Sequence, residues 1–315
     1  MRVVSVLPSA TESLCLIKGG DKFLVGRSHE DDYPSNITHL PILTASKTKF
    51  TTSADVDKQV SAALGEYDSL YSIDVELLKS LRPDIILTQD VCAVCAIDLK
   101  TVNRVALEMS PSPIVLTLNP SNLDDVFKDI LIIGEAVNLF KEAEISVNLL
   151  KQRVTVAVEK ANFYLKSNPR KNILFLEWTD PVFPAGHWTA QLIYMAGGKH
   201  IWDKLYDTKV SNTVGGGPSV RLTDLQMEEC DPNITIIAPC GLDMAQNEKE
   251  TDFIKTNKPW FKRIELNSKI VLVDGNQMYN RPGPRLVDAL EFMVGYFWGE
   301  PSFIPKDFPF KILKD

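Results

Sequence analysis

The sequence predicts an α/β protein with two Rossmann-like lobes, a long backbone helix that joins them, and a ligand cleft between the lobes. Three observations lead to this prediction. Short apolar runs alternate with amphipathic segments up to residue 122, and the same alternation returns after residue 169. Residues 123–168, which lie between, follow helical periodicity and contain no proline. Strands separated by helices form βαβ units, which build mainly parallel sheets.

The first lobe is expected to comprise residues 1–122. Strands are expected at residues 2–7, 23–26, 85–88 and 114–118. Helices are expected at residues 9–18, 75–81 and 102–109. The first strand is short, mostly β-branched and apolar, as is typical of a strand that is buried on both faces of a parallel sheet. Pro83 ends the second helix, because proline disfavours helical backbone at the residue before it.

Residues 123–168 are expected to connect the lobes as helix. Asn122 and the two aspartates at 124 and 125 suit a helix start, and Pro169 suits a stop. A single helix would be about 60 Å long at a rise of 1.5 Å per residue, and it would form a stiff link. The alternative is a kink or a division into two helices near Gly134, the only glycine of the segment.

The second lobe is expected over residues 169–315. Strands are expected at 173–176, 234–238 and 270–273, and helices at 188–196, 224–229 and 286–297. Parallel sheets bind ligands at the carboxyl ends of their strands. In both lobes those ends carry the unusual residues of the sequence, at 8–11, 28–33, 89–95, 177–187, 240–244 and 276–284.

Composition excludes several classes of function. The net charge is −7 and the pI about 5.3, which argues against nucleic acid or an anionic membrane as a partner. No apolar stretch is long enough for a membrane span. Pro8 interrupts the apolar N-terminal run, so no secretory signal is visible. We therefore expect a cytoplasmic monomer, or a periplasmic or extracellular one if a leader has been removed.

Four segments carry a family resemblance in combination. They are Leu7-Pro-Ser-Ala-Thr-Glu12, Val25-Gly-Arg-Ser-His-Glu30 with Tyr33-Pro34, Gly186-His-Trp188 with Met195-Ala-Gly-Gly198, and Arg281-Pro-Gly-Pro-Arg285. With Arg82-Pro-Asp84, they resemble the cobalamin-binding branch of the helical-backbone (class III) periplasmic ligand-binding proteins of ABC transporters. The resemblance covers residues 3–298.

The resemblance implies a binding protein rather than an enzyme, with no catalytic residues and no required cofactor. Members of this family deliver corrinoids, haem or siderophores to membrane transporters. The expected function is therefore binding of a corrinoid, or of a related tetrapyrrole or metal chelate, for uptake, carriage or delivery. The expected ligand-binding residues are Pro8, Ser9, Ala10, Thr11, His29, Glu30 and Tyr71 on the first lobe, and Trp178, His187, Trp188, Gly216, Tyr279 and Arg281 on the second.

The aromatic residues among these candidates suit a macrocycle. Flat ligands pack against flat apolar faces, which Trp178, Trp188 and Tyr279 could supply. Core packing is the alternative, and it is expected to claim at least one of the three. Gly216 lies in a run of three glycines, where the backbone can approach a ligand closely, and a plain mobile loop fits it equally well.

The histidines and two cysteines support a second hypothesis. His29 could ligate a corrin cobalt through its imidazole, or it could be a polar loop residue tied to nearby backbone. Cys92-Ala-Val-Cys95 could be a pair of partly buried thiols, a redox pair, or half of a metal site with His29 and His187. A cytosolic zinc- or iron-binding protein or enzyme that uses Cys92, Cys95 and His29 is therefore the alternative function.

Overall fold

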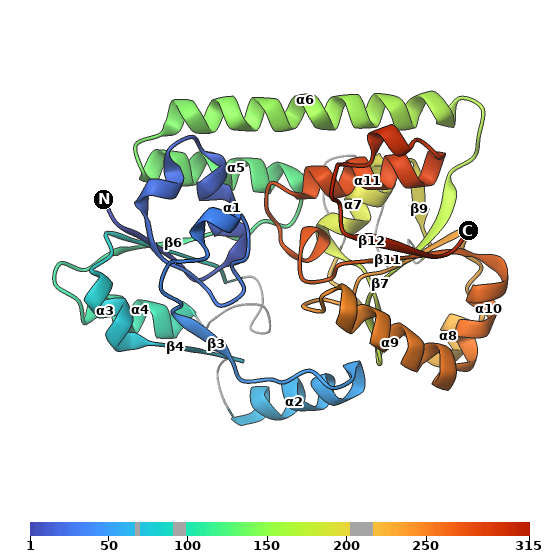
Figure 1. Cartoon of the computed structure of the whole chain (residues 1–315), viewed down its shortest axis with the longest axis horizontal. Coiled ribbons are helices and arrows are strands. Elements are labelled where there is room, and N and C mark those ends of the chain that lie inside the picture. The colour runs from blue at the N-terminus through green and yellow to red at the C-terminus, as the bar shows by residue number, and fades with distance from the viewer. Residues whose placement is uncertain (67–69, 91–98, 202–216) are drawn as a thin grey trace. The chain divides into compact units, whose positions relative to one another are not determined.

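A computed structural model describes residues 1–66, 70–90, 99–201 and 217–315 (Figure 1). The chain divides into two compact units. Unit 1 comprises residues 1–51, 55–120 and 124–149, and unit 2 comprises residues 52–54, 121–123 and 150–315. Each unit contains a largely parallel sheet with helices on both faces, so the predicted α/β class is confirmed. The lobe boundaries predicted at residues 122 and 168 remain a proposal.

The main sheet of unit 1 has four parallel strands. They are β1 (Val3–Ser5), β2 (Leu24–Gly26), β5 (Ile85–Thr88) and β6 (Ile114–Thr117), in the order β2-β1-β5-β6. Val3 lies opposite Ile85, which in turn lies opposite Ile114. The two central strands, β1 and β5, are buried throughout, which is why they appear in the sequence as unbroken apolar runs.

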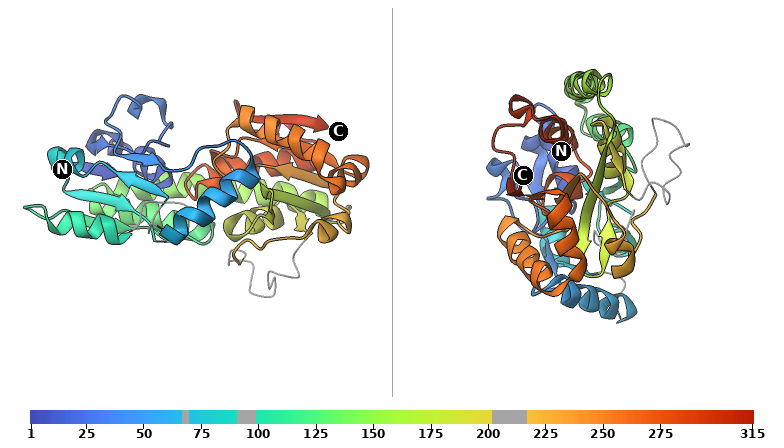
Figure 2. Two further views of the ribbon diagram at one scale, coloured as in Figure 1. Left: turned by 90° about the horizontal axis from the view of Figure 1, so that it is seen from below. Right: turned by 90° about the vertical axis from the view of Figure 1, so that its right-hand side faces the viewer.

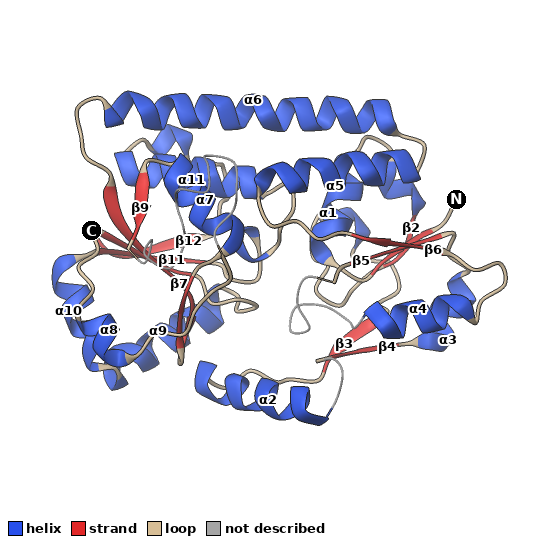
Figure 3. Ribbon diagram, turned by 180° about the vertical axis from the view of Figure 1, so that it is seen from behind, coloured by secondary structure: helices blue, strands red, loops and turns tan. Residues whose placement is uncertain are grey.

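Helices cover both faces of this sheet. On one face, α3 (Val75–Leu81) and α4 (Leu99–Leu107) pack through Leu78, Val102 and Val105 against Val4 and Ile86. On the other face lie α1 (Pro8–Leu16) and α5 (Leu123–Ala136) (Figure 3). A separate antiparallel pair, β3 (Thr44–Ser46) and β4 (Tyr71–Ile73), flanks α2 (Ser53–Glu66) in the sequence.

The expected connecting segment forms two helices, α5 and α6 (Phe140–Leu165). Asn138 separates them in the left-handed conformation at φ 60°, which asparagine tolerates better than most residues. Gly134 lets the start of α6 pack closely against the end of α5, because a Cβ at residue 134 would lie 2.4 Å from the Cβ of Ala143. An unbroken helix over the whole segment is therefore excluded. Residues 140–149 of α6 belong to unit 1, and the rest belong to unit 2.

The sheet of unit 2 has a parallel centre and antiparallel edges. It contains β7 (Lys171–Thr179), β8 (Val182–Pro184), β9 (Gly198–His200), β10 (Ile234–Ile237), β11 (Lys269–Val273) and β12 (Phe310–Lys314). The strand order is β12-β11-β10-β7-β8, and β9 also pairs with β7. The strands β9, β10 and β11 continue the parallel pattern from β7, whereas β8 and β12 pair antiparallel with their neighbours.

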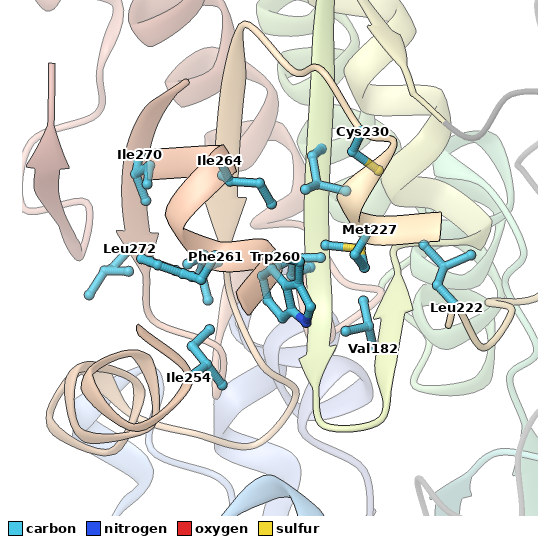
Figure 4. Packing of buried hydrophobic residues seen from close by; sticks show 13 residues of the cluster. Val182, Leu222, Met227, Cys230, Ile254, Trp260, Phe261, Ile264, Ile270 and Leu272 are labelled. Carbon is cyan, nitrogen blue, oxygen red and sulfur yellow. The ribbon is translucent and has the colours of Figure 1, made fainter. Parts of the chain in front are cut away.

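Two groups of helices enclose the sheet of unit 2 (Figures 1 and 2). On one face, α8 (Asp224–Glu228), α9 (Met244–Asn257) and α10 (Pro259–Asn267) close an apolar cluster around the fully buried Trp260 and Phe261 (Figure 4). On the other face lie α7 (His187–Met195) and α11 (Leu286–Trp298). No helix in the described part of the chain is both long and apolar enough to cross a membrane.

Candidate functional site

The loop that follows β2 in unit 1 is held from inside by Arg27. The guanidinium is buried and donates from Nη1 to the carbonyls of Ser28 and Asp31, at 3.1 and 2.9 Å. Its Nη2 donates to the carbonyl of Thr38 at 2.7 Å. Because these bonds go to backbone atoms on both sides of residue 29, they fix the conformation of the loop that carries His29.

Asp31 joins this loop to the first turn of α1. Its Oδ2 accepts hydrogen bonds from Thr11 Oγ1 and from the Ser28 amide, both at 2.8 Å. Thr11 and Asp31 are both buried, so the interaction is shielded from water. The predicted residues Pro8, Ser9, Ala10 and Thr11 are all buried in α1. The hydroxyl of Thr11 is engaged within the protein, where it positions the loop.

His29 is half-buried, with 24% of its side chain exposed. Its Nδ1 lies 2.7 Å from Thr44 Oγ1, which also accepts from the His29 amide at 3.1 Å. The ring packs against Tyr71 at a centroid distance of 5.6 Å, and Nε2 lies 4.0 Å from Glu30 Oε1. The structure thus brings together three predicted residues of unit 1, namely His29, Glu30 and Tyr71.

Thr44 and Ser28 allow two arrangements of the proton on the His29 ring. When Thr44 Oγ1 gives its proton to Ser28 Oγ, 3.2 Å away, it accepts from His29, and Nδ1 carries the proton. When Ser28 Oγ donates to Thr44 instead, Thr44 Oγ1 can donate to Nδ1, and the proton lies on Nε2. Burial lowers the pKa of His29, which keeps the imidazole neutral at pH 7. In the first arrangement Nε2 holds a lone pair, as a metal ligand requires.

His187 follows β8 in unit 2, and this strand corrects one prediction. We expected His187 after a strand of the parallel sheet. Instead, β7 turns back at residues 180–181 into β8, which runs antiparallel to it. His187 then begins α7 with φ at 47°, and its amide donates to the carbonyl of Gly217 at 2.9 Å. Its ring stacks on Trp188 at 5.6 Å, and burial lowers its pKa.

Tyr279 is packed inside unit 2. Its side chain is 1% exposed and meets Phe175 edge-on at 4.9 Å. Its hydroxyl donates to the carbonyl of Ala289 at 2.9 Å, so its polar group is satisfied as well. Trp188 is tied to the same segment, because Nε1 donates to the Tyr279 carbonyl at 2.6 Å. Tyr279 therefore has the surroundings that the core-packing alternative predicts, and its role towards a ligand stays a prediction.

The remaining predicted residues have varied surroundings. Trp178 is half-buried in β7 opposite Phe183 on β8, and Arg281 is buried just after a short 3-10 turn. Cys92, Cys95 and Gly216 lie outside the described residues. Within the described ranges, no group of three or more His, Cys, Asp or Glu side chains could hold a metal ion. The predicted cluster of His29, Cys92, Cys95 and His187 therefore stays a prediction.

Sequence reasoning missed three residues that organise the site in unit 1. Arg27 and Asp31 hold the loop, and Thr44 orients the His29 ring. No regular spacing in the sequence marks these three residues as partners of His29. The first two are neighbours of His29 within a polar run that contains several acidic residues. Thr44 is 15 residues further along the chain, so only the tertiary structure reveals its contact.

The chain has the two-lobed fold of the class III periplasmic ligand-binding proteins of ABC transporters. The periplasmic haem-binding protein HutB of Vibrio cholerae superposes with a TM-score of 0.67 at 16% identity, covering 95% of this chain and 99% of that chain. The vitamin B12 binding protein BtuF of the same organism gives 0.63 at 16% identity, covering 95% and 97%. A periplasmic haem-binding protein from Pseudomonas aeruginosa gives 0.66 at 17% identity, covering 98% and 94%.

A curated relative is similar in sequence over most of the chain. It is an uncharacterised ABC transporter substrate-binding lipoprotein, YvrC, of Bacillus subtilis strain 168. The two sequences are 23% identical over 296 residues, which cover 92% of this chain and 77% of the relative. No family model matches the sequence. The four proteins compared here are named as periplasmic or as a lipoprotein, so they lend no support to the predicted cytoplasmic location.

Proposed function

We propose that this chain is the ligand-binding component of an ABC uptake system and that its ligand is a metal macrocycle of the haem or corrinoid kind. It would act outside the cytoplasm and pass the ligand to a membrane transporter. The fold supports the general role, because the relatives with this fold are named as haem-binding, B12-binding or ABC substrate-binding proteins. No enzymatic step is part of the proposal.

The observation that carries the proposal is the neutral, half-buried imidazole of His29, whose Nδ1 lies 2.7 Å from Thr44 Oγ1. A macrocycle occupies the equatorial positions of its metal and leaves axial positions open, so one neutral imidazole is enough to bind it. In this proposal Nδ1 donates to Thr44 Oγ1, which fixes the ring orientation and leaves the lone pair on Nε2. Tyr71 lies against the imidazole and could add an aromatic edge to the macrocycle contact.

We retain the candidate ligand residues that the sequence indicated and the structure describes. On unit 1 they are the backbone of residues 8–10 together with His29, Glu30 and Tyr71. On unit 2 they are Trp178, His187, Trp188 and Arg281.

We propose a corrinoid in preference to haem. The loop of His29 continues as Glu30, Asp31 and Asp32, and the net charge of the chain is −7. Acidic surroundings disfavour the two carboxylates of haem through like-charge repulsion, whereas amide groups on a corrin rim can donate to carboxylates. The Glu30 carboxylate lies 4.0 Å from Nε2 of His29 and could accept such a bond from the ligand.

Absorbance titration tests this function directly. The purified chain is titrated with aquocobinamide, cobalamin and haemin in separate experiments. We expect saturable binding of one corrinoid per chain, with a shift of the corrin bands, and weaker binding of haemin. Saturable binding of haemin, with no binding of either corrinoid, would show that the ligand is haem and not a corrinoid. Absence of saturable binding for all three compounds would contradict the proposed function.

A further inference from the structure

A bulge in β7 places Glu177 in an unusual position. Leu176 pairs with Pro184, but the next pair joins Trp178 to Phe183, so the register between β7 and β8 shifts at Glu177. Such a bulge redirects the side chain of the extra residue away from the regular pattern of the sheet. Here the Glu177 carboxylate accepts hydrogen bonds from the Gly186 amide at 3.2 Å, through Oε2, and from the Ser219 hydroxyl, through Oε1.

The two segments that Glu177 binds are also in direct backbone contact. The His187 amide donates to the Gly217 carbonyl at 2.9 Å. Gly186 has no room for a side chain, because a Cβ would lie 2.6 Å from the Gly217 carbonyl oxygen and 2.7 Å from the Ser219 nitrogen. One carboxylate therefore bonds to both segments of a tight backbone contact, at Gly186, which precedes His187, and at Ser219.

The backbone of His187 has an uncommon conformation that its surroundings hold. Its φ of 47° lies in the left-handed region, which few residues with a Cβ adopt, although asparagine, aspartate and histidine do so more often than the others. An uncommon backbone conformation of this kind persists where the surrounding structure holds it, and it is most common at functional sites. In this conformation the imidazole of His187 stacks on Trp188, whose indole is anchored to the Tyr279 carbonyl.

We propose that Glu177 is a positioning residue for the ligand site: it holds residues 185–187 against residues 217–219 and so keeps His187 in the orientation that contacts the ligand. This inference rests on the proposed function, and it adds a residue that the sequence did not single out as a site residue. Glu177 itself does not touch the ligand in this account. Its effect on binding passes through His187.

A double-mutant cycle separates this role from a general structural one. Dissociation constants for aquocobinamide are measured for the wild type, Glu177→Leu, His187→Ala and the double variant. We expect Glu177→Leu to weaken binding by about tenfold, within the usual range for coupled neighbours. In the His187→Ala background, the same change should have little further effect. Equal losses in both backgrounds, or no loss in Glu177→Leu, would overturn the proposal.

Glu177→Gln is the matched control, because it keeps one carbonyl oxygen as an acceptor for the Gly186 amide. It should bind the ligand more tightly than Glu177→Leu. A second readout needs no ligand: amide hydrogen exchange at His187 should be faster in Glu177→Leu than in Glu177→Gln. Faster exchange without any ligand binding by the wild type would support the positioning role while contradicting the proposed function. Unchanged exchange would contradict the positioning role itself.

Discussion

His29 Nδ1 lies 2.7 Å from Thr44 Oγ1, which in turn lies 3.2 Å from Ser28 Oγ. When Thr44 donates to Ser28 it accepts from His29, and the lone pair of the imidazole is then on Nε2. In the proposed function, a hydroxyl that lies 15 residues away in the sequence thus decides whether His29 can act as a ligand. Thr44 is buried, so water cannot easily replace it as the acceptor.

The first prediction concerns Thr44. Thr44→Val removes the hydroxyl and keeps the shape, so the imidazole loses the acceptor that fixes its tautomer. We expect the affinity for aquocobinamide to fall by roughly 10-fold or more, as is usual when the hydrogen-bond partner of a ligating histidine is removed. Thr44→Ser retains a hydroxyl and should bind nearly as well as the wild type. Equal affinity of Thr44→Val and the wild type would contradict the role of Thr44 in fixing the tautomer of His29.

The second prediction concerns Asn247 in α9. Its side-chain amide is fully buried and donates to the carbonyls of Ile237 and Val273, both at 2.8 Å. These carbonyls end β10 and β11, and Asn247→Ala leaves both without this donor. We expect a loss of roughly 2–4 kcal/mol in the free energy of unfolding, measured by urea denaturation. Asn257→Ala, at the exposed end of the same helix, is the control and should cost under about 1 kcal/mol.

The helix that contains Asn247 shows why part of the fold could not be predicted. α9 buries Asn247, Glu250 and Thr251 beside a single isoleucine, so its buried face has no apolar period. Its start is encoded locally, by a capping box between Asp243 and Gln246. By contrast, β5 and α3 occur over the predicted residues, because buried strands and amphipathic helices carry their pattern in the local sequence.

The candidate site, like the fold, could be predicted only in part from the sequence. His29 and His187 could be singled out because they follow apolar runs in polar loops. The hairpin of β7 and β8 could not, because the pattern does not show in which direction the short strand runs. The contact between His29 and Thr44 depends on tertiary packing, and the bulge at Glu177 depends on the register between β7 and β8. The spacing of residues along the sequence reveals neither.

The third prediction concerns pH. Burial lowers the pKa of His200 in β9 to about 4. Because the unfolded chain takes up this proton near pH 6.5 and the folded chain does not, stability should fall as the pH decreases from about 6.5 to about 4. The contribution of one such group is on the order of 3 kcal/mol.

The test compares the wild type with His200→Asn by urea denaturation at several pH values. The wild type should lose stability more steeply than the variant between pH 6.5 and pH 4, and the carboxylates contribute equally to both proteins. Above pH 7 the difference between the two should be constant. Parallel pH profiles over the whole range would contradict the lowered pKa of His200.

The absorbance spectrum of bound aquocobinamide tests the central claim most directly. In the wild type, replacement of a cobalt-bound water by the His29 imidazole should shift the corrin bands. His29→Gln should bind more weakly and without this shift, whereas His39→Gln, which changes an exposed histidine of the same unit, should behave as the wild type. The same band shift in His29→Gln as in the wild type would contradict ligation by His29.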